Sequence, residues 1–332
     1  MTHAAMGASH RSAADSLRAL APYLPLVIFL GLIIYLGVEA PSFLAPSTII
    51  LILKQSIPTV VVSLGLATVV MAGGDDVVSG GIDLSIPSIA VLAAAIVADQ
   101  VTNQGTSILF ALPLAIIVAL IAGAFNAFLV VIVGMTPLLA TLASGAAFVG
   151  ISRMITHSRR INVSDPFIVG LRDGQVAGIP VGVLAAFALA VIFFVALHRT
   201  RWGLNLQAAG GNRDAAEISG LQPRRFVAQS FVIAGIMGGI ASVFVLARGS
   251  GSSPGSEENL LLEMVLATFL GAAFSPRRVV TLWGAVLGAV LVSALSVGFG
   301  SVGIDVFWTG CIKGGLILIV VASAAVSRNT AR

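Results

Sequence analysis

Few side chains in this sequence combine the types and the spacing that chemistry on a bound substrate requires. The four histidines, His3, His10, His157 and His198, are far apart, and none lies at a recognisable spacing from a nucleophile. The single cysteine, Cys311, lies inside an apolar run and cannot form an internal disulfide. No group of residues has metal-ligand spacing, and neither GxxxxGKS nor GxxxxGKT occurs. The sequence therefore predicts no catalytic residue, no metal site and no nucleotide site of its own.

A segment rich in Gly and Asp, AGGDDVVSGGIDLSIPS at 72–88, separates two apolar runs. Asp83 and Ser85 are of the types that cap a following helix. In lipid, a broken helix must find new partners for its freed backbone groups, so such breaks pack within protein or line a cavity. Two interpretations stay open, a loop with a helix cap and a gate or path element. We expect Asp75 and Asp76 to lie in solvent.

Three further polar side chains lie inside apolar runs. An ion in hydrocarbon is costly, so Lys313 is a functional candidate, although it could also snorkel towards the membrane surface. For Glu263, capping or snorkelling is the favoured interpretation. Asn126 can make a helix–helix hydrogen bond or line a path. The candidate residues for a path or gate are thus Asp83, Ser85, Asn126 and Lys313.

Composition indicates what kind of element must position these side chains. Hydrophobic residues make up 58% of the 332 residues and charged residues 10%, whereas a soluble domain carries about 25% charged residues. A soluble chain would have too little polar surface to cover itself. The apolar runs are long and continuous, unlike the alternating segments of a β-barrel. The net charge of +4 comes from basic residues scattered over loop ends, which indicates membrane topology and lipid contact and not nucleic-acid binding.

Ten apolar runs meet or approach the length of a transmembrane helix, which is about 20 residues. The sequence therefore predicts an all-α polytopic transmembrane helical bundle of about ten spans, with a broken helix near residues 73–85. The run 107–133 is too long for one straight span, so we expect it to tilt or to extend past the bilayer. The short apolar segment 43–53 is interpreted as an interfacial helix. The predicted spans are 22–38, 57–72, 82–98, 107–133, 137–155, 180–198, 227–247, 260–274, 279–299 and 304–326.

Orientation follows from the bias of Lys and Arg towards cytoplasmic loops. With a cytoplasmic N-terminus, the inside loops hold eleven of the 18 basic residues and the outside loops six. This predicts a cytoplasmic tail at 1–21, a transmembrane domain at 22–326 and a cytoplasmic tail at 327–332. A cleaved signal peptide is the alternative to a retained first span. The outside segment 157–179 disagrees with the rule, because it carries three arginines.

The longest predicted cytoplasmic loop is at about 199–226. Asn212 can cap a helix there, the acidic residues Asp214 and Glu217 follow it, and Gly220 can end the helix. We expect a short helix at the cytoplasmic face, with an ordinary surface turn as the alternative.

Small residues recur four apart in the last four predicted spans. Such GxxxG pairs offer a flat helix face for close packing in lipid. Packing within the subunit and packing across a dimer interface both remain open. The pairs are Gly235 with Gly239, Gly284 with Gly288, and Gly310 with Gly314.

Three stretches resemble one family, the ribose-type permease subunits of bacterial ATP-binding cassette importers, which also serve xylose, arabinose and galactose. They are GGIDLSIPS at 80–88, AAGGNRDAAEISGL at 208–221 and FWTGCIKGGLILIVVA at 307–322. The resemblance implies a homodimeric pore in the bacterial inner membrane. It also implies a separate ATPase subunit on the cytoplasmic face, which binds the ATP, and a periplasmic binding protein on the other face. This chain itself would hold no cofactor.

The resemblance places 208–221 as the segment that couples the pore to the ATPase. The residues that it assigns to coupling are Gly210, Gly211, Asn212, Asp214, Ala215, Ala216, Glu217 and Gly220. The chain departs from the family pattern twice. GGDDVVS resembles a seven-residue insertion before the second Gly pair, and GAAFSPRRV at 271–279 replaces a Gly-rich turn.

The expected function is therefore translocation of a monosaccharide that a periplasmic binding protein delivers. Two alternatives remain at this point. One is a permease of the same superfamily for a nucleoside, an autoinducer or another polar solute. The other is a secondary carrier driven by an ion gradient. The sequence does not identify the solute, because a separate binding protein would hold much of the selectivity.

Overall fold

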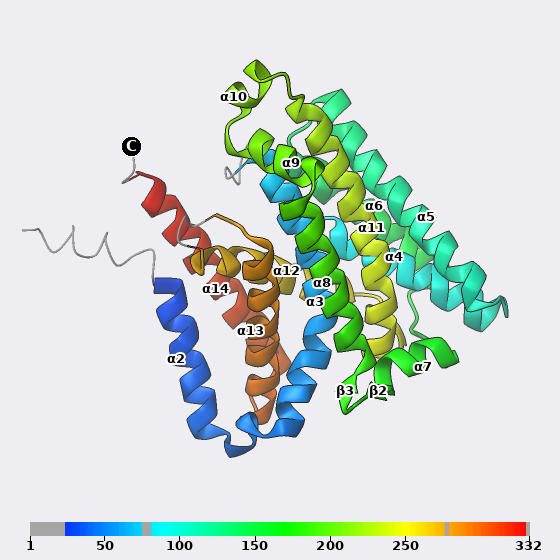
Figure 1. Ribbon diagram of the computed structural model, residues 1–332. Coiled ribbons are helices and arrows are strands. Elements are labelled where there is room, and N and C mark those ends of the chain that lie inside the picture. The colour runs from blue at the N-terminus through cyan, green and yellow to red at the C-terminus, as the bar shows by residue number, and fades with distance from the viewer. Residues whose placement is uncertain (1–23, 75–80, 276–278, 330–332) are drawn as a thin grey trace, which may run out of the picture.

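The computed structural model describes residues 24–74, 81–275 and 279–329, and in this part of the chain nearly all regular structure is helical (Figure 1). The longer helices are α2 (Leu24–Glu39), α3 (Pro46–Gly73), α4 (Ile86–Ala98), α5 (Ile108–Ala127), α6 (Pro137–Thr156), α8 (Val181–Arg199), α9 (Arg201–Gly211), α11 (Pro223–Gly249), α12 (Ser256–Ala273), α13 (Leu282–Ser301) and α14 (Val306–Asn329). The shorter ones are η2 (Pro41–Leu44), η3 (Asp99–Asn103), η4 (Phe128–Val133), α7 (Pro166–Asp173) and α10 (Arg213–Ile218). The tail 1–21, Asp75, Asp76, and Arg277 and Arg278 of the GAAFSPRRV turn lie outside the described residues, as do residues 330–332 of the C-terminal tail.

Strands are few and short in the described part. β1 (Ile161–Asn162) pairs with β4 (Gly251–Ser252), and β2 (Gln175–Val176) pairs with β3 (Ile179–Pro180), both antiparallel. The first pair ties the α6–α7 connection to the α11–α12 connection. Helices therefore form the fold, and these strands fasten connections at one end of it.

Seven helices among the described residues are long and apolar enough to cross a membrane. They are Pro46–Gly73, Ile86–Asn103, Ile108–Val133, Pro137–Thr156, Val181–Arg199, Pro223–Gly249 and Leu282–Ser301. Two shorter apolar helices, α2 and the part of α14 at Trp308–Ala322, accompany them. The first half of α12 carries three glutamates, which reduce its apolar character. The all-α membrane bundle is confirmed, while the number of ten spans stays a prediction.

Proline explains several helix starts. Pro46, Pro137 and Pro223 occupy the first turns of α3, α6 and α11, where the missing N–H has no helical partner in any case. The segment 43–53 was expected to be a separate interfacial helix, and this is wrong. Residues from Pro46 onward belong to α3, which continues without a break through Pro58 to Gly73.

The break predicted near residues 73–85 is present. α3 ends at Gly73, and α4 begins only at Ile86. The long run 107–133 forms α5 followed directly by η4, and together they span 26 residues.

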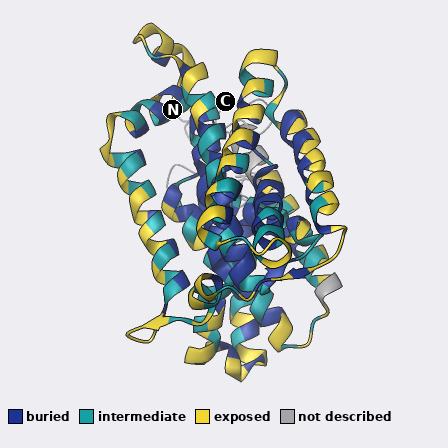
Figure 2. Ribbon diagram, turned by 90° about the vertical axis from the view of Figure 1, so that its right-hand side faces the viewer, coloured by how far each residue is buried: buried dark blue, intermediate teal, exposed yellow. Residues whose placement is uncertain are grey.

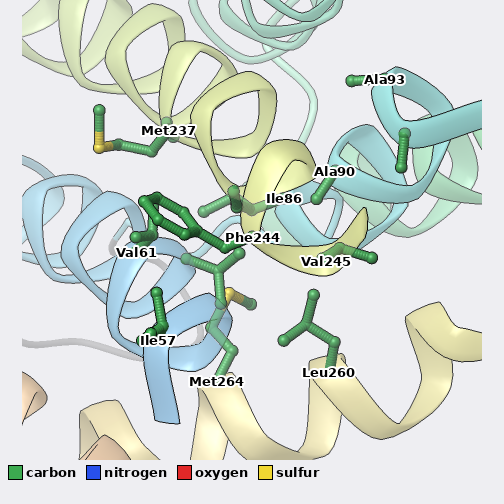
Figure 3. Packing of buried hydrophobic residues seen from close by; sticks show 14 of the residues in the cluster. Ile57, Val61, Ile86, Ala90, Ala93, Met237, Phe244, Val245, Leu260 and Met264 are labelled. Carbon is green, nitrogen blue, oxygen red and sulfur yellow. The ribbon is translucent and has the colours of Figure 1, made fainter. Parts of the chain in front are cut away.

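Most residues of α3 and α11 are buried. Figure 2 shows that the buried residues gather in the interior of the bundle. Figure 3 shows residues of four helices in one cluster, among them Ile57 and Val61 of α3, Phe244 of α11 and Met264 of α12. Segments far apart in the sequence therefore share one core.

Two of the three GxxxG pairs pack inside the chain. Gly235 of α11 lies against Gly123 of α5, and a methyl group added to Gly123 would lie 2.9 Å from the Cα of Gly235. Gly284 and Gly288 of α13 meet the α12 backbone near Gly271 and Ala267. In contrast, added methyl groups on Gly310 and Gly314 of α14 would meet no atom within 4 Å. Packing within the subunit therefore accounts for the first two pairs only.

Candidate functional site

A buried chain of hydrogen bonds joins Asp83, Ser85 and Asn126, three of the four predicted path residues. The Ser85 hydroxyl donates to Asp83 Oδ1 at 2.6 Å and accepts from Asn126 Nδ2 at 2.7 Å. The Ser85 backbone N–H also donates to Asp83 Oδ1, at 2.9 Å. All three residues are fully buried. The structure thus brings the break between α3 and α4 into direct contact with the middle of the bundle through α5.

This arrangement corrects the expectation that Asp83 and Ser85 cap α4. Ser85 occupies the N-cap position, but its side chain makes no capping hydrogen bond. Its hydroxyl is instead used by Asp83 and Asn126. Pro87, within the first turn, has no N–H to satisfy, which reduces the need for a cap.

Further contacts hold the break in place. The backbone N–H of Leu84 donates to the Thr141 hydroxyl of α6 at 3.1 Å. Gly81 packs so closely against α3 that an added methyl group would overlap the carbonyl group of Val69. Among the described residues, Asp83 Oδ2 and Asn126 Oδ1 have no hydrogen-bond partner. The polar chain is therefore rigidly placed and still has two free acceptor atoms.

Lys313, the fourth predicted path residue, belongs to a different cluster. Its ammonium group lies 2.9 Å from Glu263 Oε1 and is almost completely buried. The Thr59 hydroxyl donates to Glu263 Oε2 at 2.8 Å, and Arg248 approaches the same oxygen at 3.4 Å. Lys313 therefore does not snorkel, and Glu263 neither caps nor snorkels, because each neutralises the other inside the bundle. The sequence signal for Arg248 and Thr59 was weak, because Arg248 lies in the last turn of a helix and nothing distinguishes Thr59 from the other threonines of the apolar runs.

A pocket of about 440 Å³ adjoins this ion cluster. Its lining comes from α3, α11, α12 and α13: Leu51, Gln55, Arg248, Glu263, Ser293, Ser296, Val297, Gly300 and Ser301. A second pocket of about 140 Å³ shares Leu51, Gln55 and Arg248 with it and reaches Lys54 and Arg172. The second pocket includes Leu171 and Arg172 of α7. In Figure 1, α7 lies at the end of the bundle opposite α9 and α10.

The predicted coupling segment forms the last turns of α9, the residue Asn212, and α10. Asn212 Oδ1 accepts from the N–H of Ala215 at 3.0 Å, which confirms the predicted cap of a short helix. Gly220 has φ +82°, the left-handed conformation that ends a helix. Asp214, Ala215 and Glu217 are exposed, as are Gly211 and Asn212, whereas Ala216 is buried. The surface turn that was the alternative is excluded.

Sequence reasoning missed the most exposed large apolar residue of this segment. Ile218, the last residue of α10, is 89% exposed. Arg213 and Glu217, one turn apart, form an exposed ion pair at 3.3 Å on the same short helix.

The opposite end carries the arginines that disagreed with the charge rule. Arg172 of α7 donates to the Ser250 hydroxyl at 2.7 Å and to Asp173 Oδ2 at 2.9 Å. The hydrogen bond from Arg172 to Asp173, together with the charge of Arg172, holds the pKa of the Asp173 carboxyl below its ordinary value. Arg160 bonds to Asn162 Oδ1 and to the carbonyl of Gly249. These arginines therefore fasten two connections to each other.

Comparison with known proteins identifies relatives of this chain. A family model described as "Branched-chain amino acid transport system / permease component" matches residues 48–321. The ribose import permease protein of Bacillus subtilis (strain 168) is 30% identical over 308 residues, which cover 92% of each chain. The D-allose transport system permease protein of Escherichia coli (strain K12) is 26% identical over 280 residues, 84% of each chain. The L-arabinose ABC transporter permease protein of Azospirillum brasilense is 26% identical over 306 residues, 92% of this chain and 88% of its own. No solved structure matches significantly.

The fold is a bundle of long apolar helices with buried polar clusters, and a permease matches the chain over nearly its whole length. Together these findings define the class: a multi-pass membrane permease subunit. Within this class, the chain belongs to the family of branched-chain amino acid transport system permease components. The resemblance to sugar importer permeases, expected from three short motifs, is confirmed.

Proposed function

We propose that this chain is the translocation subunit of an ATP-driven importer and that its solute is a monosaccharide of the ribose, xylose, arabinose or galactose type. The observation that carries the proposal is the match to a ribose import permease over 92% of both chains. The allose and arabinose permeases match over similar lengths. The family description names branched-chain amino acids, but the full-length relatives with named solutes given above are permeases for sugars.

The segment from Gly210 to Gly220 is proposed as the contact with a separate ATPase subunit, which binds the ATP. Support comes from its geometry. α9 packs on the end of α3, while α10 projects with Ile218 and its charged neighbours exposed. Force applied to α10 would therefore reach α3 through α9.

The proposal includes a periplasmic binding protein at the end of the bundle that carries α7, and cytoplasmic termini. We also propose that residues 22–326 form the permease domain between two tails. The functional unit is proposed to be a homodimer. Gly310 and Gly314 of α14 support the dimer, because an added methyl group at either position would meet no atom of the described residues within 4 Å. Asp83, Ser85 and Asn126 are proposed to lie along the path, and Lys313 to brace it through Glu263.

Reconstitution into vesicles tests the proposal. The chain is combined with its ATPase and binding protein, and uptake of labelled ribose, allose, arabinose, galactose and xylose is measured with and without ATP. We expect ATP-dependent uptake of at least one sugar and none without the ATPase. Uptake by the chain alone under an ion gradient would establish a secondary carrier instead. ATP-driven uptake of nucleosides with none of the sugars would establish the other alternative.

A further inference from the structure

The pocket beside the ion cluster has a polar wall that the bundle does not use fully. Arg248 contacts Glu263 Oε2 and the carbonyl of Gln55 through one terminal nitrogen. Its Nε and its other terminal nitrogen have no hydrogen-bond partner in the described part of the chain, and neither has the Gln55 side-chain amide. Arg248 is therefore held in place at one nitrogen, and it lines a space of about 440 Å³ with its remaining donors unpaired.

The α13 side of the pocket supplies acceptors. Ser293, Ser296, Gly300 and Ser301 recur at helical spacing on one face of that helix. The Ser296 hydroxyl donates to the carbonyl of Val292, and the Ser301 hydroxyl donates to that of Val297, both at 3.0 Å. Each hydroxyl has thus used its hydrogen, and its oxygen can still accept.

Glu263 holds Arg248 in place at the pocket, and neither of its carboxylate oxygens is free. Lys313, Thr59 and Arg248 already engage both of its oxygens. Arg248 is partly exposed, at 21%, while Lys313 is nearly enclosed. The cluster therefore turns Arg248 towards the pocket and keeps Lys313 behind it.

The pocket combines donors from α3 and α11, acceptors from α13 and two aliphatic side chains, Leu51 and Val297. Such a site is suited to a ring that carries several hydroxyl groups. Each sugar hydroxyl both donates and accepts, and the C–H face of the ring is apolar. The volume lies in the range of small-molecule sites, which is roughly 300–1,000 Å³. A solute site in a translocation path must also release its ligand, so binding should be weak.

We propose that this pocket is a low-affinity subsite for a neutral monosaccharide, in which Arg248 and Gln55 donate to ring hydroxyls and the α13 serines accept from them. The inference rests on the proposed function and makes it more specific, because it places a solute contact in the permease subunit itself. The ligand is a neutral sugar and not a sugar acid, because the hydroxyls of Ser296 and Ser301 have used their hydrogens and would not satisfy a carboxylate.

The test uses the fact that Cys311 is the single cysteine of the chain. Cys311→Ser removes it, and Ser296→Cys then places one thiol in the pocket wall. The purified full-length permease is treated with N-ethylmaleimide, with and without each of the five sugars at concentrations up to about 100 mM, a range chosen because a transit site binds weakly. We expect at least one sugar to slow alkylation at least threefold. The matched control is Ser253→Cys, at the same end of the bundle and similarly half-buried but outside the pocket, and its rate should not change.

Ser301→Cys at the pocket rim provides the same measurement if Ser296→Cys does not fold. Unchanged alkylation with all five sugars, or equal slowing at Ser253→Cys, would overturn the subsite. Protection by gluconate or glucuronate but by no neutral sugar would overturn the neutral class. Alkylation needs neither ATP nor a partner subunit. Sugar uptake by the complete importer without protection therefore rejects the subsite alone, whereas the absence of uptake rejects the proposed function.

Discussion

Gly210 of α9 lies directly against the carbonyl group of Met71, three residues before α3 gives way to the break. A methyl group added to Gly210 would overlap that carbonyl oxygen. On the other side of the break, Gly81 lies just as closely against Val69 of α3. The end of α3 is therefore clamped between the coupling segment and the residues that lead to Asp83. We expect this clamp to transmit movement of α10 to the buried polar chain.

Replacing Gly210 with Val should uncouple α10 from the buried polar chain of Asp83, Ser85 and Asn126. The added atoms cannot fit between α9 and α3, so α9 must move, at a cost of about 1–3 kcal/mol. We expect sugar-stimulated ATPase activity of the reconstituted complex to fall about tenfold or more, with membrane insertion unchanged. Gly150→Val is the matched control, since Gly150 lies in α6 outside the proposed contact and an added methyl group there meets no atom within 4 Å. Equal losses in both variants would refute the clamp.

Ile218→Asp should weaken the contact with the ATPase subunit. The side chain is 89% exposed, so the substitution costs the fold little, whereas an anchor residue at an interface can contribute about 2 kcal/mol or more. Co-purification of the ATPase with the permease measures the effect, and we expect a loss of roughly 30-fold in affinity. Val176→Asp, at the opposite end and 58% exposed, serves as the control and should retain the ATPase. Undiminished co-purification with Ile218→Asp would exclude α10 as the contact.

The Glu263–Lys313 pair should be costly to break from one side only. Glu263→Gln leaves the Lys313 ammonium group buried without its carboxylate, and such a loss costs about 3–5 kcal/mol. Adding Lys313→Met removes the stranded charge and should recover part of this loss. Thermal unfolding of the purified protein in detergent measures the two single variants, Glu263→Gln and Lys313→Met, and the double variant. A double variant as unstable as the sum of the two single variants would show that the charges do not interact.

Ser85→Ala should disturb the polar chain at its middle. It leaves Asp83 Oδ1 without the hydroxyl donor and Asn126 Nδ2 without its acceptor, and each buried group without a partner costs about 1–3 kcal/mol. We expect a lower unfolding temperature together with reduced sugar uptake. Ser63→Ala is the control, because the buried Ser63 hydroxyl has no partner among the described residues and its removal should be neutral or stabilising. Similar losses in the two variants would mean that the chain of hydrogen bonds contributes nothing specific.

Local patterns proved reliable where the decisive physics is local. The apolar runs predicted membrane helices because a helix satisfies all its backbone groups within one segment. Asn212 and Gly220 predicted the bounds of a short helix because a cap and a left-handed residue act on adjacent backbone groups. The prediction for segment 43–53 was wrong, because its short length concealed its continuity with α3 through Pro58.

The sequence by itself determined the membrane, the helical class, the break before Asp83 and the short helix capped by Asn212, because each follows from hydrophobicity or from neighbouring residues. Only the tertiary structure decided which polar side chains meet. Glu263 and Lys313 are 50 residues apart, and Asn126 and Ser85 are 41 apart. An intramembrane charge is costly alone and acceptable when paired, and the partner is fixed by how α12, α14 and α11 pack. The pocket beside Arg248 arises from the same packing, which no local pattern encodes.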